Sequence, residues 1–355
     1  MQPDLLHYED TMGLPGAMAH EVQHREIFHV NRIAKRGDSI CRTHVQTQLI
    51  KGLRIDTYES EVKMEIIINA DDFGASKGIT DSILECFTAS LNSTSIIATG
   101  SAFDYAISEF KKISKPNKRI AVHINLLEGR PLCPPQEISH LVDKEGNFCH
   151  SFISLLIAYY SGDNEKKRKL SKEIKNEISA QIRKVQINID GNNGINIDSH
   201  QHFHMLPFIF KIIVELEKEF NIKYIRIPRE NFIFDFNVIC KSPVNLVKIL
   251  LLNHLSKKCI KLLSNTQIQY PDYFIGVLAT GLMNINFIEK SISSIKNKNN
   301  MKLEILLHPG QASIEEAYIW KSYPHLLDFY ISSNRTLEKN CLLENNPLFA
   351  KLEKV

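Results

Sequence analysis

The chain has 355 residues, of which 43% are hydrophobic and 23% charged, and its formal net charge is +3. This balance is typical of a folded protein with enough apolar material for a sizeable core. The small net charge and the lack of a basic stripe argue against nucleic acid as a partner, and no apolar run is long enough to predict a membrane span. The seven cysteines are scattered without a CxxC pair, which indicates neither a disulfide framework nor a zinc ribbon and predicts a cytoplasmic location.

Residues 1–63 differ from the rest of the chain. They show neither a period of 2 nor one of 3.6, they contain the turn signals GLPG and RGDS, and they begin without the apolar segment of a signal peptide. We expect an unstructured or poorly ordered extension over 1–63 and one folded domain over 64–355. Whether the extension belongs to the native protein stays open.

From Met64 onward, short apolar segments that predict strands alternate with amphipathic segments that predict helices. The expected strands are Glu65 to Asn69 and the segments STSIIATG, RIAVHINL, GINIDSH, KYIRIPRE, FIGVLA and LEILLHPG. The expected helices cover 76–91, 103–113, 165–185 and 207–221. Residues 231–270 predict a helical segment without clear periodicity, for which a lid or cap is the interpretation.

Strands that alternate with helices predict an α/β fold with a parallel sheet. Several of these strands end in an acid, a histidine or an arginine. Functional residues gathered at the carboxyl ends of parallel strands are typical of a (β/α) barrel, TIM-like or distorted. An open doubly wound sheet places its site at the same edge, so it stays an alternative at this point.

Two adjacent carboxylates, Asp71 and Asp72, follow the first strand in the segment NADDFG. Neighbouring carboxylates repel each other and are costly to bury unless a cation or hydrogen-bond donors offset them. On a continuing strand they would face opposite sides, whereas a loop beginning at Asp71 would turn both inward. A capping turn before Ser76 explains the same residues without any chemistry, and on this segment alone both interpretations stand.

Histidines stand at the ends of two further strands. A lone histidine such as His123 in VHINL is more often a core residue than a ligand. His200, His202 and His204 alternate in DSHQHFH, and on an extended segment they would share one face. The apolar residues on both sides indicate burial, and clustered imidazoles beside a carboxylate favour a metal site.

One carboxylate and two imidazoles from separate strands would make a metal site with open positions for water and substrate. Such a site suits hydrolysis by metal-activated water. A structural site, by contrast, is usually closed by four ligands.

The motifs resemble those of the YdjC-like carbohydrate deacetylases, which are related to the polysaccharide deacetylases. The resemblance rests on NADDFG, HINL with the following EGRPL, DSHQHFHMLP, IRIPRE, FIGVLATG and EILLHPG, in this order from Met64 almost to the C-terminus. The chain departs from the family pattern in residues 1–63, and 231–270 matches only loosely. The second departure leaves the substrate open, because such insertions shape a pocket.

The resemblance implies a hydrolase that removes the acetyl group from an N-acetylated carbohydrate, such as a chitin oligosaccharide, on a TIM-like or distorted seven-stranded barrel. It places one divalent metal ion on Asp72, His123 and His200. The resemblance favours Mg²⁺, while two imidazoles also suit Zn²⁺. By analogy with the polysaccharide deacetylases, Asp71 would be the general base and His308, in LLHPG, the general acid. A homodimer is also implied.

Four further residues complete the expected site. Asn125 is expected to donate a hydrogen bond close to the first histidine ligand, or simply to end its strand. His202 and His204 would bind substrate or hold the ligand imidazoles in place, and the second role is slightly preferred. Arg229, in IRIPRE, would orient Asp71 or bind substrate.

Two other functions fit the same residues. A hydrolase of a phosphoester or a cyclic amide could use the same ligands, although a phosphatase would more naturally show additional Lys or Arg and a second metal. A catalytically idle sugar-binding protein would have no need for the acid–base pair of Asp71 and His308.

Overall fold

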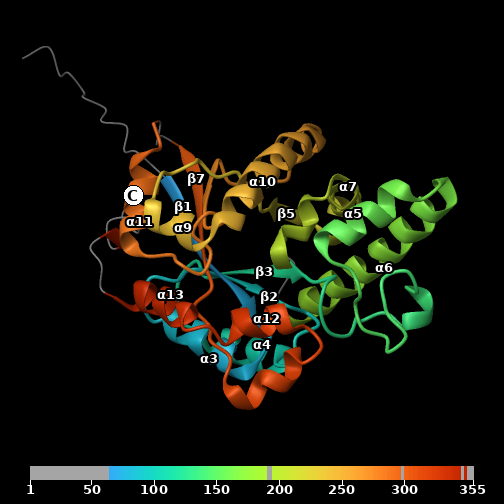
Figure 1. Cartoon of the computed structure of the whole chain (residues 1–355), viewed down its shortest axis with the longest axis horizontal. Helices are drawn as coiled ribbons and strands as arrows, with labels where there is room; N and C mark the ends of the chain where they lie inside the picture. Colours follow the sequence, from blue (N-terminus) through green and yellow to red (C-terminus); the bar gives the residue numbers. More distant parts are fainter. Residues whose placement is uncertain (1–63, 190–193, 297–299, 345–347, 350–355) are drawn as a thin grey trace, which may run out of the picture. The chain divides into compact units, whose positions relative to one another are not determined.

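A parallel sheet of seven strands organises the part of the chain that this computed structural model describes, residues 64–189, 194–296, 300–344 and 348–349 (Figure 1). The extension predicted over 1–63 lies outside these residues. The strand order is β5-β4-β3-β2-β1-β7-β6. The strands are β1 (Met64–Phe73), β2 (Ser93–Ile96), β3 (Arg119–Ile124), β4 (Ile195–Ser199), β5 (Ile222–Ile225), β6 (Tyr273–Ile275) and β7 (Met301–Leu307). All seven coincide with predicted segments, and every pair is parallel.

The sheet curls into a distorted half-barrel. Two isolated parallel bridges, Tyr224 with Gln269 and Glu230 with Phe274, link the segment around β5 to the segment that leads through β6. The two outer strands of the sheet are therefore brought toward each other. The expected distorted seven-stranded barrel is confirmed, and the open doubly wound alternative is set aside.

Helices follow most of the strands. They are α3 (Lys77–Cys86), α4 (Phe103–Lys112), α5 (Phe152–Ser161), α6 (Asn164–Asn188), α7 (Pro207–Glu215), α8 (Glu217–Phe220), α9 (Phe236–Lys241), α10 (Pro243–Leu262), α11 (Ile285–Ser293), α12 (Pro324–Tyr330) and α13 (Asn334–Leu343). Three short 3-10 segments add η1 (Pro135–Glu137), η3 (His200–Met205) and η4 (Ile314–Trp320). Within the described ranges, no helix is both long and apolar enough to cross a membrane.

The long helix α6 shows why the sequence pattern predicts these elements well. The Asp163 side chain accepts a hydrogen bond from the Lys166 amide and caps its first turn. Its apolar residues recur every three or four positions and are buried, while Lys and Glu cover the opposite face. The buried apolar stripe consists of Leu170, Ile174, Ile178, Ile182 and Val185. Figure 1 shows α6 beside α5 at one side of the sheet.

Two glycines bring the loops after β1 and β2 into close contact. Gly74 adopts a φ of +83°, a backbone conformation that favours glycine. At Gly100, a Cβ atom would collide with the backbone carbonyl of Gly74. This close approach holds the loop that follows the two aspartates of β1.

Candidate active site

The predicted site residues meet at the carboxyl ends of the strands. A cavity of about 590 Å³ opens there, lined by residues that include Asp71, Asp72, His123, His200 and His308. The aspartates belong to the end of β1, His123 lies in β3, and the other two histidines directly follow β4 and β7. This convergence is what parallel strands predict.

Asp71 and Asp72 belong to a strand rather than to the loop that the sequence predicted. β1 continues to Phe73, but its register with β2 shifts between Ala70 and Phe73. Asp72 has a φ of +69°, in the left-handed region. Because this turn of the backbone breaks the alternation of the strand, two neighbouring side chains line the same cavity.

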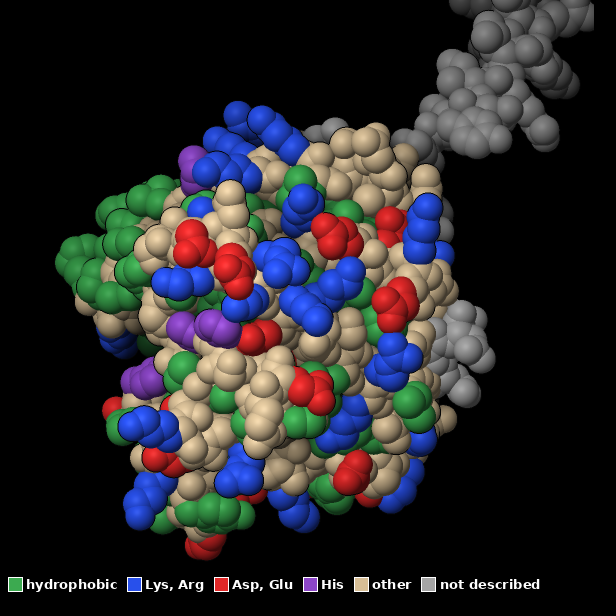
Figure 2. All heavy atoms as spheres, turned by 90° about the vertical axis from the view of Figure 1, so that its right-hand side faces the viewer, with side chains coloured by type: hydrophobic (Ala, Val, Ile, Leu, Met, Phe, Trp, Pro, Cys, Tyr) green, Lys and Arg blue, Asp and Glu red, His purple; other side chains and the backbone are tan. Residues whose placement is uncertain are grey.

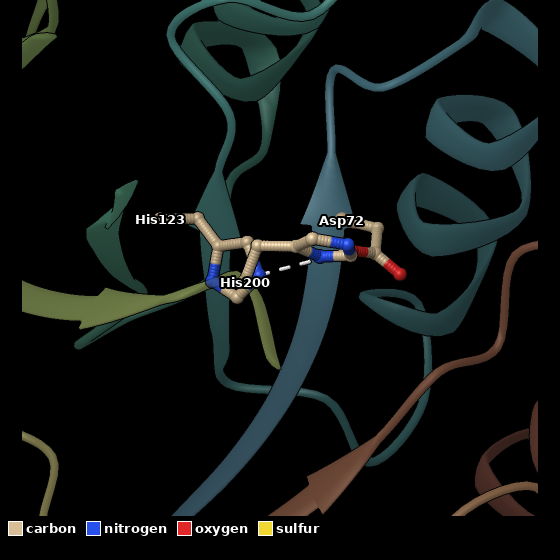
Figure 3. Close-up of side chains that lie close together, drawn as sticks. All are labelled: Asp72, His123 and His200. Atoms are coloured by element: carbon tan, nitrogen blue, oxygen red, sulfur yellow. Dashed lines mark ion pairs between the residues drawn. The ribbon is translucent and has the colours of Figure 1, made fainter. Parts of the chain in front are cut away.

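Asp72, His123 and His200 form a compact buried cluster, in which one ligand atom of each lies within 4.8 Å of the others (Figure 3). The Asp72 Oδ1 atom is 3.3 Å from His200 Nδ1 and 3.7 Å from His123 Nε2. The Nε2 atom of His200 is buried and has no hydrogen-bond partner among the described residues. A carboxylate and two imidazoles so arranged fit a divalent metal ion, and these three residues could hold one.

Asp198 fixes the orientation of the His123 ring. Its Oδ1 atom lies 2.6 Å from His123 Nδ1, which leaves Nε2 on the side of Asp72. Burial alone would lower the pKa of His123, but Asp71 and Asp198 raise it to about 9. Burial alone would raise the pKa of Asp198, but Arg226 and His123 lower it to about 2. A carboxylate behind a ligand imidazole is a common arrangement at metal sites.

Asp71 is anchored by Arg226. The two Nη atoms of this buried arginine lie 2.8 and 2.9 Å from the two Asp71 carboxylate oxygens. Asn69 donates a third hydrogen bond, of 2.8 Å, to Asp71 Oδ1. This fork restricts rotation of the carboxylate. Because Oδ1 accepts two hydrogen bonds and Oδ2 only that of Arg226, Oδ2 is the oxygen with the greater remaining capacity to accept a proton.

The expectation that Arg229 orients Asp71 is corrected by this geometry. Arg229 is exposed, donates a 2.8 Å hydrogen bond to the Asp272 carbonyl oxygen, and is not among the residues that line the described cavity. The physical reason is position along the chain. Arg226 directly follows β5 at the carboxyl edge of the sheet, whereas Arg229 lies further along, where the chain runs beside β6.

The three alternating histidines do not share one face. β4 ends at Ser199, and η3 follows with Gln201 and His202 at positive φ. His204 is buried and ties two segments together: its Nδ1 atom is 2.6 Å from Ser199 Oγ, and its Nε2 atom is 2.8 Å from the Arg226 carbonyl oxygen. His204 therefore supports the backbone of the site and does not touch the ligand cluster.

His202 lines the cavity, and its Nδ1 atom is buried without a hydrogen-bond partner among the described residues. Burial and the nearby Arg226 guanidinium hold the pKa of His202 well below its usual range. A neutral imidazole at the cavity wall can donate or accept a hydrogen bond, which suits contact with substrate.

Asn125 ends its strand rather than contacting the ligand histidines. Its Oδ1 atom accepts hydrogen bonds from the Leu127 and Glu128 amides, at 3.0 and 3.2 Å. Its Nδ2 atom donates to Thr99 Oγ1 and to the Glu128 carbonyl oxygen, both at 2.8 Å. Of the two roles expected for Asn125, the structure shows the simpler one, and the turn it makes places Glu128 beside the cluster.

Three residues that the sequence analysis did not single out surround Asp72 and His200. Arg335 Nη2 lies 3.1 Å from Asp72 Oδ2, and the Tyr330 hydroxyl is 3.4 Å from Oδ1. Burial would raise the pKa of Asp72, but His200 and Arg335 hold it well below its usual range. Glu128 Oε2 is buried without a hydrogen-bond partner in the described chain, 3.9 Å from His200 Nε2, and burial raises the pKa of Glu128.

His308 lies at the cavity on the other side of the aspartates, after β7. Its backbone amide donates a hydrogen bond to Glu338 of α13, and its Nδ1 atom is 3.6 Å from the same carboxylate. The Phe329 ring packs edge-on against it, with ring centroids 5.4 Å apart. The imidazole is thus held by two C-terminal helices, α12 and α13, at a place where it borders the same cavity as Asp71.

Comparisons with known proteins identify the family of this chain. Residues 65–345 match the family described as YdjC-like protein. Carbohydrate deacetylase from Xenopus laevis is 28% identical over 269 residues, which are 72% of this chain and 83% of that protein. Carbohydrate deacetylase from Danio rerio is 25% identical over 311 residues, 79% of this chain and 92% of that protein. A solved structure of an Enterococcus faecalis protein named for cellobiose-phosphate cleavage shares the fold at 20% identity, with a TM-score of 0.58 over 82% of this chain and 94% of that one. Because the family match covers most of its length, this chain belongs to the YdjC-like protein family.

Proposed function

We propose that the chain is a metal-dependent deacetylase that releases acetate from an N-acetylated carbohydrate. The observation that carries this proposal is the buried Asp72, His123 and His200 cluster beside an anchored Asp71, in a cavity that His308 also lines. The relatives named carbohydrate deacetylase support the same reaction. Mg²⁺ is the metal that the sequence resemblance favours, and the two imidazoles of the donor set equally suit Zn²⁺.

Asp71 is the proton acceptor in this proposal. A divalent ion held by the cluster would polarise the acetyl carbonyl group and lower the pKa of water at the site. The Asp71 Oδ2 atom lies 3.9 Å from His123 Nε2, and Asp71, His123 and Asp198 form a second group of possible ligands. In this proposal the metal takes the group of Asp72, His123 and His200, and Asp71 stays beside it as a free carboxylate. The Arg226 fork fixes the carboxylate at the cavity, where Oδ2, which accepts only one hydrogen bond, can take the proton from the attacking water.

His308 is the proton donor to the departing amine. It follows β7, the neighbour of β1 in the sheet, so His308 and Asp71 border the same cavity from adjacent strand ends and can both reach a bound acetamido group. Glu338 lies 3.6 Å from His308 Nδ1 and, together with the Phe329 ring, holds the imidazole at the edge of the cavity. The cytoplasmic location and the homodimer stay predictions.

The phosphoester alternative finds less support. Phosphate groups are usually held by several arginines or lysines. Among the residues that line the described cavity, Lys248 is the only lysine or arginine. Arg226 and Arg335 point to the carboxylates of the site and are already engaged there.

Acetate release is the measurement that tests the proposal. Purified protein is incubated with a panel of N-acetylated mono- and disaccharides, with and without added Mg²⁺ or Zn²⁺. We expect metal-dependent release for the wild type. Asp71→Asn should lower kcat by a factor of about 100 to 10,000, because a general base contributes that much, while metal content stays unchanged.

Asp81→Asn is the matched control, because Asp81 lies on the outside of α3 and pairs with Lys77. It should retain wild-type turnover. Near-normal turnover of Asp71→Asn would remove Asp71 from the role of base. A generic phosphoester is tested beside the sugars. If the metal-loaded protein releases no acetate from any sugar but cleaves the phosphoester, phosphoester hydrolysis is the favoured function.

A further inference from the structure

The cavity has a polar floor and apolar walls. The carboxylates and imidazoles described above form the floor. One wall is made by Phe152 and Ile153 of α5, and another by Val244, Val247 and Leu251 of α10. Lys248 of α10 also lines the cavity, but apolar side chains make up most of these two walls, so sugar hydroxyl groups would find few hydrogen-bond partners there.

The apolar lining continues outside the cavity. On α10, Val247 is 65% exposed, and Val244 and Leu250 are exposed to a similar degree. On α5, Ile157 is 60% exposed, one turn beyond Ile153. On the face shown in Figure 2, the largest group of hydrophobic side chains lies at the left edge, and smaller groups lie elsewhere on the face. Soluble monomers rarely expose large contiguous apolar surfaces, and such a surface usually marks a binding site.

Helix α10 is apolar on two sides, which an ordinary surface helix is not. Ile249, Leu252 and Leu255 face the core, while Val247 and Leu251 face the cavity and the solvent. The segment 231–270, which the sequence predicts only as a helical lid or cap, therefore supplies one wall of the site. No described residue covers the exposed apolar side of α10.

We propose that the substrate is amphipathic, an N-acetylated sugar joined to an apolar chain. The sugar lies on the polar floor, and the chain leaves the cavity between α5 and α10. This inference rests on the proposed deacetylase function and names its substrate class. An oligosaccharide extending along the same path would bring hydroxyl groups against Val247 and Leu251, where desolvation is not repaid by hydrogen bonds.

The continuity of the lining favours a substrate chain over two other occupants. A second copy of this chain, or a membrane surface without glycolipid, would also cover exposed residues such as Val247. Neither would explain why apolar residues continue inward to Leu252 and Val277, which are buried and still line the cavity. An apolar chain attached to the sugar contacts both the inner and the outer residues.

The test compares glycosides of N-acetylglucosamine that differ only in the length of their alkyl chain. Methyl, butyl and octyl β-glycosides are used below their micellar concentrations, beside an N-acetylated disaccharide, and acetate release gives KM and kcat. Binding is measured in parallel by calorimetry. From methyl to octyl, KM should fall about tenfold or more, because each buried methylene group favours binding, while kcat changes little.

Val247→Asp places a charge on the proposed path and should raise the KM of the octyl glycoside toward that of the methyl glycoside. Ile187→Asp, at a 77% exposed position of α6 outside the cavity lining, is the matched control and should behave as the wild type.

The outcomes separate this inference from the proposed function. Acetate release with equal KM values for all chain lengths overturns the amphipathic substrate and leaves the deacetylase. Chain-dependent binding without acetate release overturns the deacetylase and leaves the apolar path. If the protein neither binds these glycosides nor releases acetate from them, both proposals are overturned. If Val247→Asp leaves the chain-length dependence intact but abolishes dimers in sedimentation, or binding to vesicles without glycolipid, the surface serves that other partner and the inference is wrong.

Discussion

The guanidinium of Arg226 contacts three carboxylates in the interior of the barrel. Besides Asp71, its guanidinium lies 2.8 Å from Asp198 Oδ2 and 2.6 Å from Glu304 Oε1. The Arg226 side chain is fully buried and Asp198 and Glu304 are nearly so, and neither of these two carboxylates lines the cavity, so water cannot readily replace Arg226 as their partner. The geometry also links the proposed base, Asp71, to Asp198 behind the His123 ring.

Arg226→Lys should destabilise the protein, because a lysine keeps one charge but cannot form the fork with Asp71 while reaching Glu304. We expect the free energy of unfolding to fall by about 2–4 kcal/mol, as for other broken buried ion pairs. Urea denaturation measures this change. Arg229→Lys, at an exposed position, is the control and should change the unfolding free energy by less than about 0.5 kcal/mol. Equal effects of the two substitutions would contradict the assigned role of Arg226.

Some of these residues carry a signal that sequence reasoning can use. Asp198 stands in INIDS, Arg226 in IRI and Glu304 in LEILL, each the one charge of a short, largely apolar segment. A buried charge needs a partner of opposite sign. Two acids and one arginine in buried segments therefore predict that the arginine lies between the two carboxylates. Arg335 and Tyr330 carry no comparable signal, because they reach Asp72 from C-terminal helices whose position depends on the tertiary fold.

The turn after β4 decides where the histidine ligands point. Gln201 and His202 adopt φ values of 51° and 56°, so two successive residues occupy the left-handed region. This backbone turns His204 away from the cavity to Ser199 and leaves His200 beside Asp72. The left-handed region is unfavourable for most residues and is rarely used twice in succession.

Substitutions at Gln201 should separate the effect of its backbone conformation on stability from the effect of its side chain, because this side chain is exposed. Gln201→Gly removes the side chain and suits a positive φ, so the unfolding free energy should stay within about 0.5 kcal/mol of the wild type. Gln201→Val removes the same amide group but adds a branched Cβ, and should cost about 1–2 kcal/mol. Urea denaturation of both variants tests this. If the two variants were equally stable, the left-handed backbone would not matter to the fold.

The strands could be predicted from the sequence, while the connections between them could be predicted only in part. Each strand is a short apolar run between polar segments, and its charged end places it at the carboxyl edge of the sheet. The sequence of 200–205 is equally compatible with an extended segment. Alternating histidines fit a strand, and the positive φ values of Gln201 and His202 cannot be recognised from the residue types. Helices α5, α11, α12 and α13 have no counterpart among the helices expected from the sequence. Where α12 and α13 pack depends on the tertiary fold and not on their local sequence.

At the scale of the whole molecule, Glu230 connects the two sides of the barrel opening. It follows β5, and its carboxylate accepts hydrogen bonds from the amides of Gly276, Val277 and Leu278, which follow β6. Burial raises the pKa of Glu230 to about 7, and the three amide donors only partly offset this. The folded protein therefore binds a proton here more tightly than the unfolded chain does.

The sign of the pH effect follows from this raised pKa. The protonated group stabilises the fold fully below the unfolded pKa of about 4.5, and this stabilisation is lost as the pH rises through about 7. Glu230→Gln cannot titrate. From pH 5 to pH 8, the unfolding free energy of the wild type should therefore fall by about 2–3 kcal/mol relative to that of Glu230→Gln. Urea denaturation at both pH values measures it, and a difference independent of pH would show that Glu230 does not titrate in this range.

The two ends of the domain meet at the carboxylate of Asp72. Its arginine partner, Arg335, lies 263 residues further along the chain, and Glu338 of the same helix holds His308. A ribosome delivers a protein from its N-terminus, so β1 emerges long before α13. During synthesis, Asp72, His123 and His200 are all present before the helix that completes their surroundings. The nascent chain thus carries the metal-binding residues early but acquires an ordered site only in the last stage of its translation.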